Sequence, residues 1–326
     1  MAKDLLYTNG VIAAREKYLL NDKIFKLCDS GAEEALRAVS ESGFGKGVEV
    51  ASVYEYEKLV SADEAAIDEF IREYAPSRAE AAYLLSPRDF HNAKAAVKAK
   101  YLNLSTEHML APAGLIPAEE VVNCVNSGDL KSLGDVLGEA VEQSAALFSD
   151  ENDKEASGAE IGIIFEKALY KHLHEACARN GLLKKLLTTK ADMTNILTAL
   201  RSDKEEYAAK SYVTGGKISE KQLASLFDED SEKALKVFKS TPYYEFVKKC
   251  IADKAAGLPL TTAERICESY ETEYFTAKKY ELQKNQPFLY YVFRRRAENA
   301  NVRILFVCLL AGMNESEIKR RLRAIQ

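Results

Sequence analysis

The sequence predicts an all-α protein built from three similar helical domains in a pseudo-threefold arrangement. First, apolar residues recur at spacings of three and four almost everywhere, which is the period of amphipathic helices, whereas the period-two runs of strands are rare. Second, helix-breaking residues are scarce, with 16 glycines and 7 prolines among 326 residues. Third, three sequence landmarks each occur three times at intervals of roughly 100 residues, as expected for an internal repeat.

The first landmark is a carboxylate followed three positions later by an asparagine, on a helix that is otherwise largely apolar. It occurs as Asp89 with Asn92, as Asp192 with Asn195, and as Glu298 with Asn301. Such a pair alone occurs by chance, but here the carboxylates are 103 and 106 residues apart. Each also follows a helix-breaking residue, either Pro76, Gly181 or Pro287. The even spacing therefore indicates three copies of one helix.

The second landmark is a turn-forming residue seven positions before a leucine. Asp29, Asn126 and Asp228 are each predicted to open an amphipathic helix. The third landmark is a glycine that ends one helix shortly before another begins, at Gly114, Gly216 and Gly312. Pro117 suits a first helical position, and Ser219 with Gln222 and Asn314 with Glu317 have the spacing of capping boxes. The landmarks predict domains at 10–113, 114–215 and 216–326, the last with a short C-terminal helix.

The repeated carboxylate and asparagine pairs allow two interpretations. As structural groups they would cap loops and fix the register of the helices, since a buried amide needs hydrogen-bond partners. As functional groups they would line a cavity that the helical tip of another subunit enters, because a threefold helical array presents a concave surface. The spacing of Arg294 and Glu298 also suits an ion pair along the helix.

Composition excludes several other classes of protein. With 47% hydrophobic and 29% charged residues the chain resembles a soluble globular protein, and a net charge of −5 gives no general attraction to nucleic acid. The charged N-terminus does not resemble a signal peptide. The uncharged run 304–314 is about half of the ~20 residues that span a bilayer, so a membrane anchor is not expected.

Catalytic, cofactor and metal sites are not expected either. The stretch GFGKGV at 43–48 lacks the glycine and the hydroxyl residue of a P-loop, because Ser40 and Gly47 occupy those positions, and it is predicted to be a turn that ends a helix. His172 and His174 diverge on a predicted helix, which argues against a shared metal. The six cysteines are expected to be reduced, mostly buried thiols. A helical scaffold of an unrelated complex and an enzyme that uses paired carboxylates remain as alternative functions.

The segments 86–101 and 287–325 resemble the family of C subunits of the archaeal-type and bacterial V-type rotary ATPases, which is related to the d subunit of the eukaryotic vacuolar ATPase. In the C-terminal segment a helix carries a glutamate, an asparagine and an arginine, and a glycine turn and a short final helix follow. The residues that fit are Glu298, Asn301, Arg303, Ile304, Gly312, Glu317, Ile318 and Leu322.

This resemblance implies a funnel-shaped, non-catalytic rotor subunit of the central stalk without cofactor or small-molecule substrate. Its partners would be the D and F subunits, which form the axle, and the membrane proteolipid ring, on the cytoplasmic side of the membrane. It would couple ATP hydrolysis or synthesis to the transport of protons or sodium ions; the sequence does not distinguish the two ions. Asp89, Asn92, Asp192, Asn195, Glu298, Asn301 and Arg303 are the candidate socket-lining or structural residues.

Overall fold

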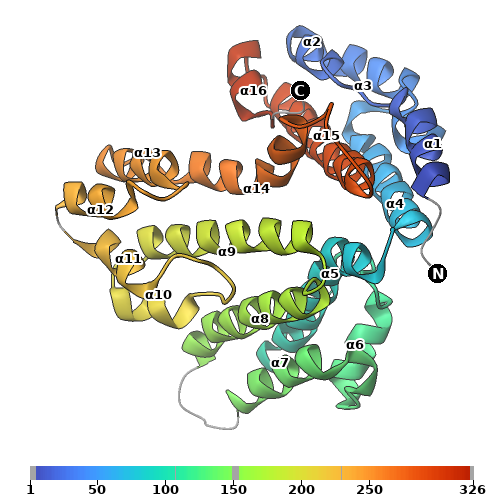
Figure 1. Cartoon of the computed structure of the whole chain (residues 1–326). Helices are drawn as coiled ribbons and strands as arrows, with labels where there is room; N and C mark the ends of the chain where they lie inside the picture. The colour runs from blue at the N-terminus through green and yellow to red at the C-terminus, as the bar shows by residue number, and fades with distance from the viewer. Residues whose placement is uncertain (1–4, 107, 149–153, 229, 324–326) are drawn as a thin grey trace. The chain divides into compact units, whose positions relative to one another are not determined.

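The computed structural model describes residues 5–106, 108–148, 154–228 and 230–323, without the side chains of 154–157 (Figure 1). Within these residues the chain forms sixteen α-helices, α1 to α16, and five 3₁₀ helices, and no strand. The all-α prediction is therefore confirmed. The chain divides into two compact units, Met1–Ser77 with Glu268–Gln326 (unit 1) and Arg78–Cys267 (unit 2). The predicted three-domain boundaries stay a prediction.

Unit 1 is built around one long helix from the C-terminal part of the chain. Its helices are α1 (Leu5–Glu16), α2 (Lys23–Lys26), α3 (Ala32–Glu41), α4 (Tyr56–Tyr74), α15 (Gln286–Leu310) and α16 (Glu315–Arg321), with the last residues of α14 (Thr261–Thr276). Helix α15 packs against α1, α2, α3, α4 and α16, so the two ends of the chain share one core. That core contains Leu59, Val60, Val302, Leu305 and Phe306, all with no exposed surface.

Helix α15 is buried on nearly all sides along most of its length. This explains why its sequence shows no polar face, as expected for a central helix. Proline at its first turn is tolerated because the N–H groups there have no partner inside the helix. No helix in the described part of the chain is both long and apolar enough to cross a membrane.

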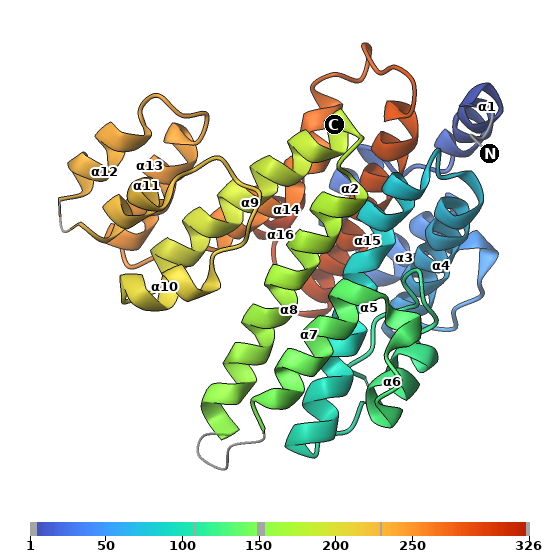
Figure 2. The same ribbon diagram turned by 60° about the horizontal axis from the view of Figure 1, so that its bottom comes forward.

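Unit 2 is an assembly of longer helices. They are α5 (Arg78–Leu102), α6 (Ala118–Ser127), α7 (Asp135–Ala146), α8 (Lys154–Ala176), α9 (Gly181–Arg201), α10 (Glu205–Ser211), α11 (Glu220–Ala224), α12 (Ser231–Phe238) and α13 (Tyr244–Ala255), with the first part of α14 up to Cys267. Helices α5, α7 and α8 lie side by side, and α6 covers α5 (Figure 2). Their apolar faces meet around Phe90, Val97, Val121 and Ile161.

The prediction from the second sequence landmark is wrong for its middle copy. Asn126 does not open a helix but lies in the last turn of α6, which ends at Gly128 in the left-handed conformation. The first and third copies do lie at the entry to α3 and α12, where Asp230 caps α12. The equivalent helix in the middle copy is α7, which begins at Asp135 after a 3₁₀ turn, Lys131–Leu133. The error arises because α6 is longer than α2 and α11.

The third landmark is confirmed in part. Ser219 with Gln222 and Asn314 with Glu317 form complete capping boxes at the start of α11 and α16. Pro117 lies at the N-cap of α6, one position before the predicted one. The GFGKGV turn is also confirmed, since α3 ends at Glu41 and Gly43 follows with a φ of 83°. Five of the six cysteines are buried, and Cys267 is partly exposed.

The core of unit 1 can be tested at two adjacent positions of α15. Phe306 is fully buried and stacks on Tyr56 with ring centroids 5.1 Å apart, whereas the neighbouring Val307 is 54% exposed. We expect Phe306→Ala to lower the free energy of unfolding by about 3–5 kcal/mol because it leaves a cavity. The control Val307→Ala should change it by less than about 1 kcal/mol. Urea unfolding followed by circular dichroism measures both; equal losses would contradict this packing.

Candidate functional site

Each of the three predicted asparagines holds the backbone of a later turn. The side-chain amide nitrogen donates to a carbonyl oxygen and the side-chain oxygen accepts from the N–H of the same residue, at distances of 2.7 to 3.2 Å. The pairs are Asn92 with Ala111, Asn195 with Val213, and Asn301 with Arg323. We call these three double hydrogen bonds the amide clamps. Their sequence separations are 19, 18 and 22 residues.

The carboxylates one turn earlier hold the start of the next short helix. Asp89 accepts the N–H groups of Leu115 and Ile116, both at 3.0 Å. Asp192 accepts those of Lys217 and Ile218 at 2.6 and 2.8 Å, and its other oxygen accepts the hydroxyl of Tyr243 at 2.7 Å. These bonds are charge-assisted, so each is about twice as strong as a neutral one. Clamp and carboxylate together fix both ends of one turn.

A glycine lets each aspartate come this close. A Cβ atom on Gly114 would lie 2.2 Å from Oδ1 of Asp89, and one on Gly216 would lie 2.3 Å from Oδ1 of Asp192. Both distances are far below van der Waals contact, so any side chain would push the carboxylate away. The two glycines of the third landmark are therefore required by the site, not only by the end of a helix.

The third copy is completed by the N-terminal part of the chain. Glu298 accepts the N–H of Asn21 at 2.9 Å, and Asn21 lies two residues before α2. Ile116 and Ile218 likewise lie two residues before α6 and α11. The segment before α2 is thus the third held turn. Gly312 is not the equivalent of Gly114 and Gly216. Gly216 follows α10 and the clamped Val213, whereas Gly312 comes before α16, and the clamped Arg323 follows α16.

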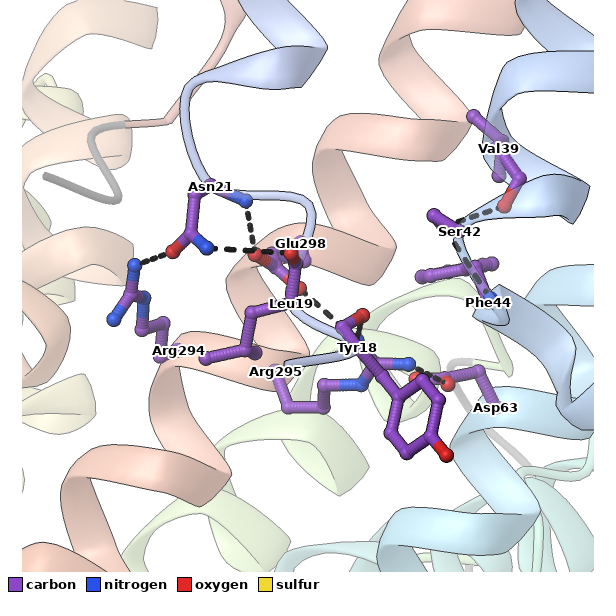
Figure 3. A network of polar contacts seen from close by, with 10 residues as sticks. All are labelled: Tyr18, Leu19, Asn21, Val39, Ser42, Phe44, Asp63, Arg294, Arg295 and Glu298. Atoms are coloured by element: carbon purple, nitrogen blue, oxygen red, sulfur yellow. Dashed lines mark hydrogen bonds and ion pairs between the residues drawn. The ribbon is translucent and has the colours of Figure 1, made fainter. Parts of the chain in front are cut away.

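A buried ionic cluster supports this third turn (Figure 3). The guanidinium of Arg295 pairs with Asp63 on α4, contacts Glu298 at 3.2 Å, and donates to the carbonyl of Tyr18 at 2.8 Å. Burial raises the pKa of Asp63 and of Glu298, and the charge of Arg295 opposes the rise in both. Arg294 contacts the side chain of Asn21, so the predicted ion pair between Arg294 and Glu298 is replaced by one with Arg295.

Arg303 lies further along α15 and joins it to α4. Its guanidinium donates to Glu57 at 2.5 to 3.2 Å and to Glu64 at 2.7 and 3.0 Å. These hydrogen bonds raise the pKa of Arg303 above its usual value. The side chain is 38% exposed, so we expect a modest contribution to stability from each pair.

The six residues of the predicted pairs are at most 5% exposed, and each binds backbone groups within its own unit. These contacts favour the structural interpretation, and the socket interpretation stays a prediction. Sequence reasoning missed Asn21 and Asp63, for which no spacing or motif gave a signal. It found the glycines but not the reason for them; the nearly equal sequence separations from Asp89 to Gly114 and from Asp192 to Gly216 could have indicated the contact.

The glycine requirement gives a test in unit 2. We expect Gly216→Ala to lower the free energy of unfolding by about 2–4 kcal/mol, because the Cβ displaces the buried Asp192 carboxylate from the two N–H groups that it accepts. In contrast, Gly162 lies within α8, and a Cβ atom there would meet no neighbouring atom. We therefore expect Gly162→Ala to stabilise the protein by about 0.5–1 kcal/mol. Urea denaturation compares them; a harmless Gly216→Ala would contradict the proposed contact.

An amide clamp can be tested through the backbone group that it protects. Asn195→Leu leaves the N–H and C=O of Val213 without their partner, so we expect a loss of about 2–4 kcal/mol and faster hydrogen exchange at the Val213 amide. Thr198→Leu, one turn further along α9 at a partly exposed position, is the matched control and should leave that amide protected. Unchanged exchange at Val213 in Asn195→Leu would show that the clamp is dispensable.

Comparison with known proteins adds a family match over nearly the whole chain. The family model described as ATP synthase (C/AC39) subunit matches residues 8–321. The C subunit of the V-type sodium ATPase of Enterococcus hirae is 19% identical over 335 aligned positions, which cover 97% of each chain. The matched residues include the held turn at Asn21, the buried ionic cluster and the first two amide clamps. Of the third clamp they include Asn301 but not Arg323.

Proposed function

Because the chain belongs to the C/AC39 family of V-type ATPase subunits, we propose that it is the rotor subunit that joins the central axle to the membrane ring. In this proposal the D and F subunits form the axle and a proteolipid ring forms the membrane rotor. The protein is peripheral, lies on the cytoplasmic side, and has a funnel shape made by its three repeats. It transmits torque during ATP-driven or ATP-producing transport of protons or sodium ions.

The family itself establishes the coarser role. The chain is a subunit of a V-type ATPase, its partners lie within that complex, and the C/AC39 family is an accessory one, not the catalytic subunit. The resemblance seen in the sequence is thereby confirmed, and the alternative of a scaffold for an unrelated complex is wrong. The relative from Enterococcus hirae is named as part of a sodium ATPase, and this chain could serve either ion in our proposal.

The repeated clamps are the observation that supports a torque-bearing role. A part that transmits rotation must resist deformation where its helices change direction, because any yielding there would dissipate the torque. In the first two copies the turn after a long helix is fixed at both ends by hydrogen bonds to buried side chains, and in the third the same kind of helix holds one segment near each end of the chain. Close packing of the helices adds low compressibility. Stiffness is thus built into the three equivalent places where a helical repeat would bend first.

The partners would bind through surfaces other than the clamps, which are buried. Leu6, Tyr7, Tyr54 and Tyr280 expose most of their side chains in unit 1, and Tyr207 and Leu258 do so in unit 2. Aromatic residues are enriched at protein interfaces, where they supply much of the binding energy. These positions are therefore the first places to look for the axle and the ring.

The rotor assignment predicts which covalent links the working ATPase tolerates. A photoreactive amino acid at Tyr280, which is 91% exposed, or at Tyr54 should label axle or ring subunits in the assembled enzyme. A link to axle or ring should leave ATP-driven ion transport intact, because these parts turn together, whereas an engineered link to a peripheral-stalk subunit should abolish it. The control is the same photoreactive amino acid at the buried Phe275, which should label no axle or ring subunit. Loss of transport on linking to the ring would contradict a rotor role.

A further inference from the structure

A pocket of about 440 Å³ lies within unit 1, beside the third held turn. Its wall is formed by α1, the segment around Tyr18, the GFGKG turn, α4 and α15. Its volume is within the range of roughly 300–1,000 Å³ that is typical of small-molecule sites. The rotor proposal gives this pocket no role. From the sequence, the GFGKG turn is expected only to end a helix.

An incompletely bonded carboxylate lies in the pocket wall. Asp63 is 2% exposed, and its Oδ1 pairs with Arg295 (Figure 3). Its Oδ2 is buried and makes no hydrogen bond of good geometry within the described residues, although the Gly45 N–H and the Asn299 side chain act on the same carboxylate and lower its pKa. A buried acceptor without a well-placed donor is costly, so a ligand that donates there gains from the bond. Since Arg295 already neutralises the carboxylate, a neutral hydroxyl is a better match than a cation.

Two further cations line the same pocket. The guanidinium of Arg15 lies over the rings of Phe70 and Tyr74, 4.8 and 5.8 Å from their centroids, and forms no ion pair with a described residue. Lys46 pairs with Glu69, but both side chains are more than half exposed, so a ligand can displace that pair at little cost. Arg295 is compensated by Asp63 and Glu298, whereas Arg15 and Lys46 share the carboxylate of Glu69, so these two cations favour an anionic ligand.

The turn that contributes Lys46 has an unusual backbone. Gly43, Gly45, Lys46 and Gly47 all have positive φ, between 52° and 83°. Turns with left-handed residues can direct successive N–H groups to one side and form anion-binding concavities. Gly43 also lets the ring of Tyr18 approach, since a Cβ atom there would lie 2.8 Å from the ring. Tyr18 and Tyr291 add aromatic surface to the pocket wall.

We propose that this pocket binds a nucleoside phosphate. A ribose hydroxyl donates to Oδ2 of Asp63, as carboxylates accept ribose hydroxyls in dinucleotide sites. The base packs against Tyr18 and Tyr291, since base–aromatic stacking tolerates any base. The phosphate binds Arg15 and Lys46, whose charged donors suit phosphate oxygens. This binding mode differs from that of a P-loop. It uses the two cationic side chains, and it requires neither a hydroxyl residue after the lysine nor a magnesium ion.

Calorimetric titration of the full-length chain with adenosine monophosphate tests the proposal without any other part of the ATPase. We expect saturable binding that weakens by roughly tenfold or more in Arg15→Gln and in Lys46→Gln, because each loses a charged hydrogen bond. The matched control is Glu69→Gln, which breaks the same surface ion pair but leaves the pocket cations in place, and should bind at least as well as the wild type. Equal affinity of all four proteins would overturn the site.

Ligand variants separate the three contacts. Adenosine lacks the phosphate, ribose phosphate lacks the base, and the dideoxynucleotide lacks both ribose hydroxyls; each should bind more weakly than the complete ligand. The dideoxynucleotide makes Asp63 testable without altering the ionic cluster, and Tyr18→Leu tests the wall while the Tyr18 carbonyl still holds Arg295. If inorganic phosphate bound as tightly as the nucleotide, the site would be a simple anion site and the nucleoside assignment would be wrong. Failure here leaves the rotor proposal untouched, because that proposal concerns assembly.

Discussion

Buried backbone polar groups must find partners inside a protein, and this requirement shapes the molecule at the three turns that follow its long helices. A turn that leaves a helix can no longer use the helical hydrogen-bond pattern, so its N–H and C=O groups need other partners. Asn92, Asn195 and Asn301 each bind both groups of one residue, and Asp89, Asp192 and Glu298 bind the N–H groups before the next short helix. The position of each following helix therefore depends on two side chains, and the three copies share this geometry even where their sequences differ.

The first two turns and the third meet this requirement with different residues. Aspartate is short, so the backbone must come close to it, and Gly114 and Gly216 allow that approach. Glutamate is longer by one methylene, and the corresponding position before Asn21 is occupied by Leu19, whose buried side chain joins the apolar interior instead. The remaining carboxylate oxygen also has different partners, the Tyr243 hydroxyl at Asp192 and the Arg295 guanidinium at Glu298. A longer acid thus compensates for the absence of glycine.

The sequence predicted the helical class, the three polar pairs and two capping boxes, because each of these depends on spacing within one element. It did not predict that Asn21 completes the third turn, since the contact with Glu298 spans 277 residues and no local pattern records it. The assignment of Gly312 was wrong for the same reason, because the third copy is not continuous along the chain. Asp63 was missed because a single aspartate on an amphipathic helix resembles any solvated residue, whereas it is in fact buried against Arg295.

The third turn also differs in what it connects. In the first two copies one continuous loop runs from the clamped residue to the held turn, whereas in the third α15 binds Arg323 near the C-terminus and Asn21 near the N-terminus. Within the described residues these two segments meet in one apolar core, and Arg295 adds a polar link by binding Tyr18, Glu298 and Asp63 together. The same arginine lines the pocket. A ligand that binds only when this cluster is intact stabilises the cluster by an amount that grows with ligand concentration, and the intact cluster favours the ligand by the same coupling free energy. In our proposal, binding of the nucleoside phosphate therefore also stabilises the attachment of the N-terminal segment.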